Sequence, residues 1–578
     1  MAALDAGGEG AFTLVGAPPG WGKTVLLSGW AAERDAAWLT LGPGHADPRR
    51  LWSDVCDALG QKRIPLDDDV SLRLADALAG AGERPVLVLD DLDLLRGPAL
   101  ASLGELLVHG GEALHGVAAS RSDPQLPLER LRLSGRLREL RAAELAFTLP
   151  EATTMLEELD LSLRPELVER LLERTEGWAA GLRLAGLSLR GEGDPDAFVR
   201  EFAGDDRAVA DYLTGEVLAG LPAPTRELLL RTSVVERICG DLADALTGGT
   251  DGALVLERLE RSGAFVAPLD RHRTWFRYHG LFAELLRARL RLEHPGLEPE
   301  LHARAAEWLA GAGLGREAIP HALAGRGPCS AATLVADHWL DLLLDWVVPA
   351  DVLAVAEGGD DPRLVVSGAS ARLALGDPAG AEARLAAVRD DDDGDAGRLA
   401  VLLRARARGD APAAREQTAA LLGDGEPGPD GDALRALALF HHGATEFACG
   451  RLELAAEQLQ GAAAIAVDGG RDALLLGCLG RQAALELAEG RLARADHAAR
   501  HALALAEPRG WHRTPAAAWA YTALAAVHWH RDELDDAERR ADAAAAAAYA
   551  ARSRSPRTAA MWARSARVAT TAPGSRAA

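Results

Sequence analysis

The sequence predicts an α/β domain with a parallel sheet, followed by helical and winged-helix subdomains and an all-α repeat array. Over residues 11–145, short apolar runs alternate with amphipathic segments, which is typical of a parallel α/β sheet. Residues 224–292 read helix, helix, helix, hairpin, helix. Beyond residue 346, a small or polar residue followed five positions later by Ala recurs at intervals of 33, 41, 40 and 42 residues.

A glycine-rich loop joins the first strand to the first helix. The strand-like run Phe12-Thr13-Leu14-Val15 is followed by Gly16-Ala17-Pro18-Pro19-Gly20-Trp21-Gly22-Lys23-Thr24, and helical spacing starts at Val25. This is the context of a phosphate-binding loop, although Ala17 stands where the motif usually has its first glycine. The predicted nucleotide-binding residues are Ala17, Gly20, Trp21, Gly22, Lys23, Thr24 and Val25.

The residue types of this loop suit a magnesium nucleotide. Gly20 and Gly22 let the backbone wrap closely around an anion, and the N–H groups at the helix start point at it. Lys23 would neutralise phosphate charge and the Thr24 hydroxyl would bind Mg²⁺. Of 63 Lys and Arg residues only Lys23 and Lys62 are lysines, so this compact ammonium stands out. A chance Gly-Lys-Thr turn is the alternative.

Paired acids close a second apolar strand. The run Val86-Leu87-Val88-Leu89 ends in Asp90 and Asp91. Ligands of open α/β sheets bind at the carboxyl ends of strands, so we expect Asp90 on the metal side and Asp91 as the residue that positions or activates water. The alternative is a solvated acidic turn.

An arginine follows the next strand. Residues 115–119 are strand-like and run into Ser120-Arg121-Ser122. A guanidinium at this place can reach the terminal phosphate, so Arg121 is a second catalytic candidate. A surface ion pair is the default alternative in so Arg-rich a chain.

The rest of the chain is mainly helical. Thr148-Leu149-Pro150-Glu151 predicts a capping box, Pro165 a helix start and Gly177 a helix stop. The third helix of the winged-helix region, near residues 252–262, is acidic as well as basic, so this module is not expected to read DNA. We expect the divisions 1–145 (nucleotide core), 146–222 (helical), 223–292 (winged helix), 293–345 (helical connector), 346–551 (tetratricopeptide-like repeats) and 552–578 (disordered basic tail).

Composition excludes several classes. A net charge of −23 argues against a broad nucleic-acid footprint, and we expect a soluble cytoplasmic protein. The five cysteines have no metal-binding or disulfide spacing, and we expect no membrane span. The run Asp390-Asp391-Asp392-Asp393 lacks the Glu of a calcium loop. His441, His442, His528 and His530 lack a third metal ligand in sequence.

The assembled motifs resemble the signal-transduction ATPases with numerous domains (STAND), specifically LuxR-family transcriptional regulators of the maltose-regulator (MalT) type. The resemblance rests on six segments: residues 16–24, 86–91, 119–124, 144–148, Thr175-Glu176-Gly177-Trp178 and Phe276-Arg277-Tyr278-His279-Gly280-Leu281-Phe282. It spans about residues 11–345. The repeat region matches in type only.

This resemblance implies a function. ATP or ADP with Mg²⁺ would lie between the core, the helical subdomain and the winged helix, with His279 near the β-phosphate and the Gly177-Trp178 turn over the adenine. ATP and a small-molecule or protein inducer on the repeats would permit self-association, and slow hydrolysis would reset the switch. The usual C-terminal helix-turn-helix has no counterpart after Ala551, so DNA would be met only through a missing or separate domain. The alternatives are a helical-repeat scaffold with a degenerate site, or a metabolic P-loop kinase or ATPase.

Overall fold

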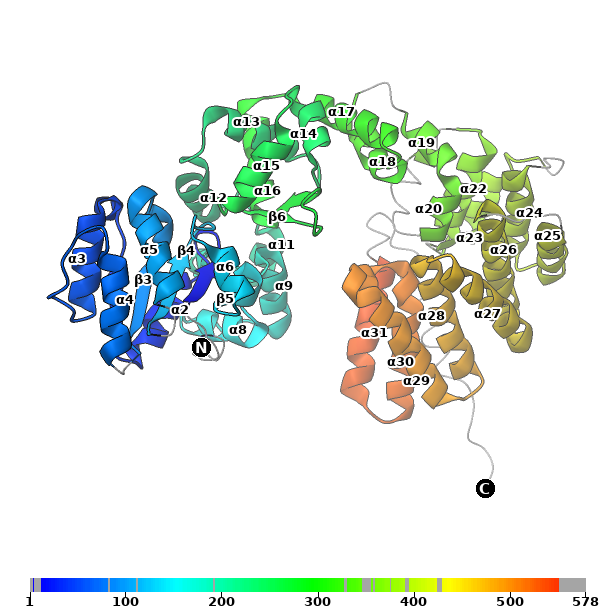
Figure 1. The fold of residues 1–578 in the computed structure, drawn as a ribbon. Helices are drawn as coiled ribbons and strands as arrows, with labels where there is room; N and C mark the ends of the chain where they lie inside the picture. Colours follow the sequence, from blue (N-terminus) through cyan, green and yellow to red (C-terminus); the bar gives the residue numbers. More distant parts are fainter. Residues whose placement is uncertain are drawn as a thin grey trace. The chain divides into compact units, whose positions relative to one another are not determined.

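The structure is a computed structural model in which two compact units, Met1–Leu301 and His302–Ala578, are described separately (Figure 1). It describes Leu4 and residues 12–81, 84–110, 113–190, 193–326, 330–345, 355–356, 359–374, 376–389, 394–423 and 429–549. The expected loop at Asp390–Asp393 and the expected basic tail lie outside these residues. Among the described helices, none is long and apolar enough to cross a membrane.

The first unit begins with a five-stranded parallel sheet. Its strands are β1 (Phe12–Gly16), β2 (Ala36–Thr40), β3 (Val86–Asp90), β4 (His115–Ser120) and β5 (Leu137–Arg141), in the order β2-β3-β4-β1-β5. The predicted α/β class is therefore confirmed. Strand β5 was not expected individually, because its sequence Leu-Arg-Glu-Leu-Arg is highly charged, as suits an edge strand.

Helices cover both faces of this sheet. Phe12 and Leu14 of β1 point to one face, where they pack with α3 (Pro48–Ala58), α4 (Val70–Ala81), α5 (Gly97–His109) and α6 (Leu128–Leu133). Val15 points to the other face and packs against α2 (Lys23–Ala32). This alternation follows from the two-residue period of a strand, and it fixes the β1–α2 loop at the carboxyl edge of the sheet.

A helical subdomain follows the core. It comprises α7 (Ala142–Leu145), α8 (Leu149–Glu157), α9 (Pro165–Thr175), α10 (Ala179–Leu189), α11 (Pro195–Glu201), α12 (Arg207–Leu213) and a π-helical turn, Thr214–Leu218. The predicted capping box is confirmed, since Glu151 Oε2 accepts from the Thr148 backbone N–H at 2.9 Å. Gly177, with φ of 74°, ends α9 as expected.

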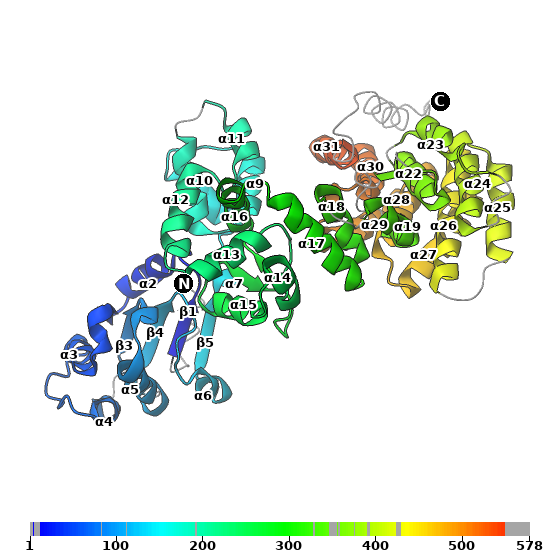
Figure 2. The same cartoon turned by 90° about the horizontal axis from the view of Figure 1, so that it is seen from above.

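The winged helix has the predicted order. It contains α13 (Ala223–Thr232), α14 (Gly240–Thr247), α15 (Gly252–Arg261), the hairpin β6 (Val266–Pro268) and β7 (Phe276–Tyr278), and α16 (Gly280–Glu293). Figure 2 shows α13, α14 and α15 gathered beside the carboxyl side of the core. The buried Tyr278 hydroxyl and Thr232 Oγ1 form a hydrogen bond of 2.6 Å between hairpin and helix.

The second unit is helical in all its described elements. After α17 (Glu298–Gly311, which spans the unit boundary), α18 (Gly315–Ala324), α19 (Ala331–Asp337) and α20 (Trp339–Asp345), helical hairpins follow. The hairpins are α22/α23 (Pro362–Ala374, Pro378–Leu385), α24/α25 (Asp395–Arg408, Ala411–Gly423), α26/α27 (Pro429–Ala448, Leu452–Asp468), α28/α29 (Asp472–Ala488, Leu492–Ala506) and α30/α31 (Pro515–His530, Leu534–Tyr549).

The turn of each hairpin falls at the small or polar residue of the repeat pattern. Gly376, Gly409, Gly450, Gly490 and Asp532 all have positive φ, between 63° and 75°. Five places later, the repeat alanines of the first four hairpins, Ala381, Ala414, Ala455 and Ala495, are completely buried at the helix crossings. The expected array of stacked hairpins is thus present, because a small residue lets two helices approach closely.

Candidate functional site

The Lys23 side chain is hydrogen-bonded to the backbone of the β1–α2 loop. Lys23 Nζ donates to the carbonyls of Ala17 at 2.7 Å and Pro18 at 3.0 Å, and the side chain is buried. Gly20 and Gly22 have φ of 79° and 76°, a conformation that favours glycine. Burial, aided by the charge of Arg121, lowers the pKa of Lys23 to about 8 against the opposing effect of three aspartates. A bound phosphate would add further negative charge beside this ammonium.

The two predicted metal-side residues meet. Thr24 Oγ1 donates to Asp90 Oδ1 at 3.1 Å, although the residues are 66 positions apart. Asp90 is buried at the end of β3, and its Oδ1 also accepts from the backbone N–H of Asp91 at 3.1 Å. A hydroxyl and a carboxylate oxygen at this separation are the hard donors that Mg²⁺ prefers. The residues present therefore fit a magnesium nucleotide, and Thr24 and Asp90 would hold its ion.

Asp91 lies beside this pair in a restrained conformation. Its φ is 56°, in the left-handed region that non-glycine residues rarely adopt. Burial, followed by the charges of Asp90 and Asp93, raises the pKa of the Asp91 carboxyl. A carboxylate with a raised pKa is suited to orient water or accept its proton.

Arg121 lies at the same edge, but its side chain is engaged elsewhere. Its Nη1 donates to Glu216 Oε2 at 2.9 Å, and its backbone N–H donates to Asp93 Oδ1 at 2.9 Å. Glu216 belongs to the π-helical turn of the helical subdomain. The guanidinium thus connects two modules in this state.

The helical subdomain closes directly on the loop. Trp178, completely buried, donates from Nε1 to the Pro19 carbonyl at 3.1 Å, and the Ala180 backbone N–H donates to the Gly20 carbonyl at 2.9 Å. A Cβ on Gly20 would come within 2.6 Å of Ala180. The Thr175–Trp178 turn therefore packs against the loop itself. Gly177 lies behind it, against the backbone of Phe147.

The winged helix contacts both other modules. Arg277 forms two hydrogen bonds with Glu176, of 2.9 and 2.6 Å, and Glu176 Oε1 also accepts from the Gly280 backbone N–H at 3.0 Å. Burial alone would raise the pKa of Glu176, but these hydrogen bonds, that from Arg277 first, hold it below its usual range. On the core side, the Asp123 backbone N–H donates to the Arg261 carbonyl at 3.3 Å.

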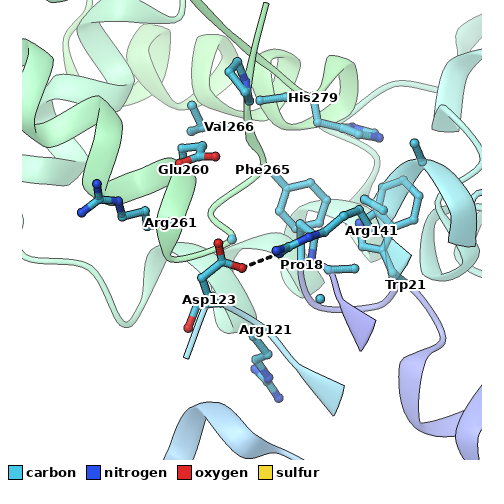
Figure 3. A pocket seen from close by; sticks show the side chains of 18 of the residues that line it. Pro18, Trp21, Arg121, Asp123, Arg141, Glu260, Arg261, Phe265, Val266 and His279 are labelled. Atoms are coloured by element: carbon cyan, nitrogen blue, oxygen red, sulfur yellow. Dashed lines mark hydrogen bonds and ion pairs between the residues drawn. The ribbon is translucent and has the colours of Figure 1, made fainter. Parts of the chain in front are cut away.

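A cavity of about 750 Å³ lies where the three modules meet (Figure 3). Its walls come from the carboxyl ends of β1, β4 and β5, from the start of the loop, and from the winged-helix hairpin. The Arg141 side chain crosses it to pair with Asp123, and Glu260 lines the opposite wall. The volume is within the range of small-molecule pockets.

Two buried nitrogens of this cavity have no hydrogen-bond partner among the residues that the structure describes. They are Trp21 Nε1 and His279 Nδ1, and both residues line the cavity. His279 Nε2 donates to the Thr175 carbonyl at 3.0 Å, so Nδ1 is the free nitrogen of a neutral imidazole. Burial lowers the pKa of His279, against an opposing effect of Glu176. An N–H without a partner needs an acceptor, which a phosphate oxygen would provide.

The remaining predicted residues are placed differently. Val25 has its side chain 74% exposed, so only its backbone can serve the loop. His528, expected to lack a third metal ligand, has ligand atoms of Glu533 and Asp536 within 4.8 Å. That expectation was incomplete, because Glu533 comes directly before helix α31 and Asp536 lies in its first turn. Asp536 is also paired with Arg539, at 2.5 Å.

Part of this chain matches a known family, and a longer part is similar to known proteins. Residues 214–298 match the family model described as the MalT winged helix domain. These residues are therefore a winged helix of the MalT type. The chain is 32% identical over 350 residues to the HTH-type transcriptional regulator MalT of Klebsiella pneumoniae subsp. pneumoniae, covering 56% of this chain and 38% of that one.

A second relative is a protein kinase. The serine/threonine-protein kinase PknK of Mycobacterium tuberculosis is 36% identical over 354 residues, covering 57% of this chain and 32% of the kinase. The chain therefore spans about a third of the length of these relatives. A STAND protein with a tetratricopeptide repeat sensor from Pyrococcus horikoshii aligns over 96% of this chain and 82% of its own, with 16% identity and a TM-score of 0.33. That likeness is too loose to support a statement about this chain.

Sequence reasoning missed the contacts that join the modules. Glu176 and Arg277 both stood in the motifs that carried the resemblance, but their pairing is a tertiary contact. Glu216 and Arg261 carried no motif. The backbone bonds to Gly20 and Asp123 depend on conformation, which no residue type reveals.

Proposed function

We propose that this chain is the ATP-binding switch of a MalT-type transcriptional regulator, with slow hydrolysis controlling self-association. The observation that carries the proposal is the cavity at the junction of three modules, lined by the unpartnered nitrogens of Trp21 and His279. A ligand held there touches all three modules at once. Its gain or loss can therefore shift their packing, which is what a switch requires.

The roles of the residues follow from their positions. Lys23 and the loop amides hold the phosphates, and Thr24 and Asp90 hold Mg²⁺, which neutralises phosphate charge when it is bound. Asp91 orients the attacking water. His279 gains a proton on Nδ1 when a phosphate approaches, because an anion raises the pKa of a buried imidazole. In the structure as described, Arg121 is held by Glu216, so its release toward the terminal phosphate would accompany opening.

We infer that the contacts among the modules belong to a closed, resting state. The winged helix is tied to the helical turn by Arg277 and Glu176, and to the core by Asp123 and Arg261. We infer that ADP favours this arrangement and that ATP with an inducer on the helical array weakens it. Ordinary coupling of this kind needs a difference of about 1–3 kcal/mol in nucleotide affinity between the two states. DNA would be bound through a further domain.

Gel filtration of the full chain with ATP, ADP or no nucleotide tests the switch. We expect a larger species with ATP than with ADP, and loss of this difference in Lys23→Ala. The matched control is Lys62→Ala, because Lys62 is the other lysine and is exposed. If the elution profile of the parent does not change with nucleotide, or if Lys23→Ala elutes like Lys62→Ala under all three conditions, a scaffold with a degenerate site is favoured.

A kinase is the second candidate function, because one relative is a serine/threonine-protein kinase. A kinase transfers the terminal phosphoryl group to an acceptor other than water. Measuring release of inorganic phosphate against label retained on protein or small molecules separates the two. We expect the released phosphate to account for all the ATP consumed.

A further inference from the structure

Among the described residues that line the cavity, Glu260 has a buried carboxylate oxygen without a hydrogen-bond partner. Glu260 lies in the last turn of α15, and its side chain is only 15% exposed. Its Oε1 lies 3.4 Å from Arg273 Nη2, so the unpartnered atom is Oε2. Because a buried acceptor needs a donor, the protein leaves one acceptor of this cavity to be satisfied by a ligand.

Backbone contacts on the following residues fix the position of Glu260 relative to the core. The Arg261 carbonyl accepts a hydrogen bond from the backbone N–H of Asp123 at 3.3 Å. Gly263 packs against the nucleotide loop so closely that a Cβ there would lie 3.6 Å from the Cα of Pro18. A recognition group needs this kind of rigid support, because a hydrogen bond selects a ligand only when its acceptor is held in place.

The surroundings of Glu260 leave its carboxylate poorly solvated. Burial is the main cause of the raised pKa of Glu260, and the charge of Asp123 adds to it. The opposing charges are those of Arg273, Arg261 and Arg141, and they do not cancel the effect of burial. A raised pKa means that the ionised form lacks stabilisation, which a hydrogen-bond donor of a bound ligand would provide.

The polar groups of the cavity differ in the part of a nucleotide that they suit. The unpartnered nitrogens of Trp21 and His279 suit phosphate oxygens. Glu260 lies on a different side of the cavity from Trp21 (Figure 3), and its negative charge would repel a phosphate. The lining also includes apolar side chains such as Ala143 and Val266. A nucleoside fits this side of the cavity, because it combines O–H and N–H donors with the flat face of a base.

We propose that Glu260 Oε2 accepts a hydrogen bond from the nucleoside part of the bound nucleotide, either from a ribose hydroxyl or from the amino group of the base, and thereby selects the ligand. This inference rests on the proposed function, because it takes the cavity as the nucleotide site. Glu260 and His279 both belong to the winged helix. This module therefore contacts both ends of the nucleotide, and the bond from Glu260 forms only while the winged helix is closed on the core.

Isothermal titration of the full chain with four diphosphates in the presence of Mg²⁺ tests this proposal. ADP is compared with 2′-deoxy-ADP, with 3′-deoxy-ADP and with purine riboside diphosphate, each of which lacks a single donor. We expect one of these analogues to bind the parent roughly tenfold or more weakly than ADP does, because a hydrogen bond to a charged acceptor is lost. The analogue that binds weakly identifies the donor as a ribose hydroxyl or as the amino group of the base.

Variants separate this hydrogen bond from a structural role of Glu260. Glu260→Met has a side chain of similar length without the carboxylate, so it should bind ADP and the weak analogue with equal affinity. Glu260→Gln retains one acceptor oxygen and should retain part of the discrimination. The control is Glu257→Met, on the same helix, which removes the ion pair with Arg261 and should keep the full affinity ratio. A purely structural role would weaken ADP and the analogue alike and leave their ratio unchanged.

Two results would overturn the role of Glu260 alone. One is equal affinity of the parent for all four diphosphates, a comparison that needs no variant to fold. The other is an affinity ratio in Glu260→Met equal to that of the parent. Failure of the parent to bind ADP, or equal ADP affinity in Lys23→Ala and the parent, would instead reject the nucleotide site of the proposed function, and this inference with it.

Discussion

Gly263 offers the sharpest test of the closed state, because the winged helix meets the core there. Gly263 follows α15 with φ of 68°, and a Cβ at this position would lie 2.1 Å from the Arg121 carbonyl oxygen. That carbonyl is in the core, so the two modules would have to separate by about 1 Å to reach even a tight contact of 3.0 Å. The adjacent backbone bond from Asp123 to Arg261, 3.3 Å long, would then be lost.

Gly248 provides a matched control. It also has a left-handed φ, 77°, in the same winged helix, but a Cβ there meets nothing within 4 Å. Both Gly→Ala changes therefore carry the conformational cost of about 1 kcal/mol or more. Only Gly263→Ala adds the clash and the lost hydrogen bond, together about 1–3 kcal/mol against the closed state.

Isothermal titration with ADP measures the difference. If ADP needs the closed state, Gly263→Ala should bind it roughly 5- to 150-fold more weakly than Gly248→Ala does. Both variants should keep the far-ultraviolet circular dichroism of the parent. Equal ADP affinities in the two variants would refute the reasoning that the Arg121–Gly263 contact belongs to the ADP-bound state.

Three further predictions concern the loop and its cover. Arg277→Ala should speed ADP release several-fold, because it removes the ion pair with Glu176, worth about 1 kcal/mol at this half-exposed site. The release rate is measured by stopped flow. The control is Arg291→Ala, which breaks an exposed ion pair with Glu298 and should leave the release rate unchanged. ATP affinity should fall above pH 8, because Lys23 of the nucleotide-free protein has a pKa of about 8 and must be protonated to bind the phosphate. Titrations from pH 7 to 9.5 should show the affinity of the parent falling by up to about tenfold per pH unit, and that of Lys23→Arg staying constant. A parent affinity that does not change with pH would contradict this. Trp178→Phe should cost about 1 kcal/mol in unfolding free energy through loss of the bond to Pro19, and a chemical denaturation midpoint equal to that of the parent would speak against that bond.

Much of the first unit could be predicted because its signals are local. A loop of small residues between an apolar run and a helical run, and an apolar run that ends in two acids, are readable without tertiary knowledge. The structure brings Thr24 and Asp90 to 3.1 Å, as the shared carboxyl edge of parallel strands requires. Repeat turns were equally readable, since Gly450 and Gly490 recur with the same neighbours and the same left-handed φ of 75°.

The interfaces could not be predicted, because they depend on where distant segments meet. Arg121 was expected near the terminal phosphate, yet its guanidinium donates a hydrogen bond to Glu216, a residue that belongs to no sequence motif. The Gly177-Trp178 turn was expected over the adenine, and its contact with the loop, from Trp178 to the Pro19 carbonyl, was not foreseen. Strand β5 escaped notice because an edge strand such as Leu137–Arg141 can be charged on its open side.

The central claim is that the loop around Lys23 binds a magnesium nucleotide and that this ligand joins three modules. Hydrogen exchange of the full chain with and without Mg·ADP measures both parts at once. The account predicts slower exchange in three separate segments, namely the loop amides of residues 20–24, the turn at residues 176–180 and the winged-helix residues 263–279, with no slowing in Lys23→Ala. Slower exchange confined to the loop, or no change at all, would contradict it.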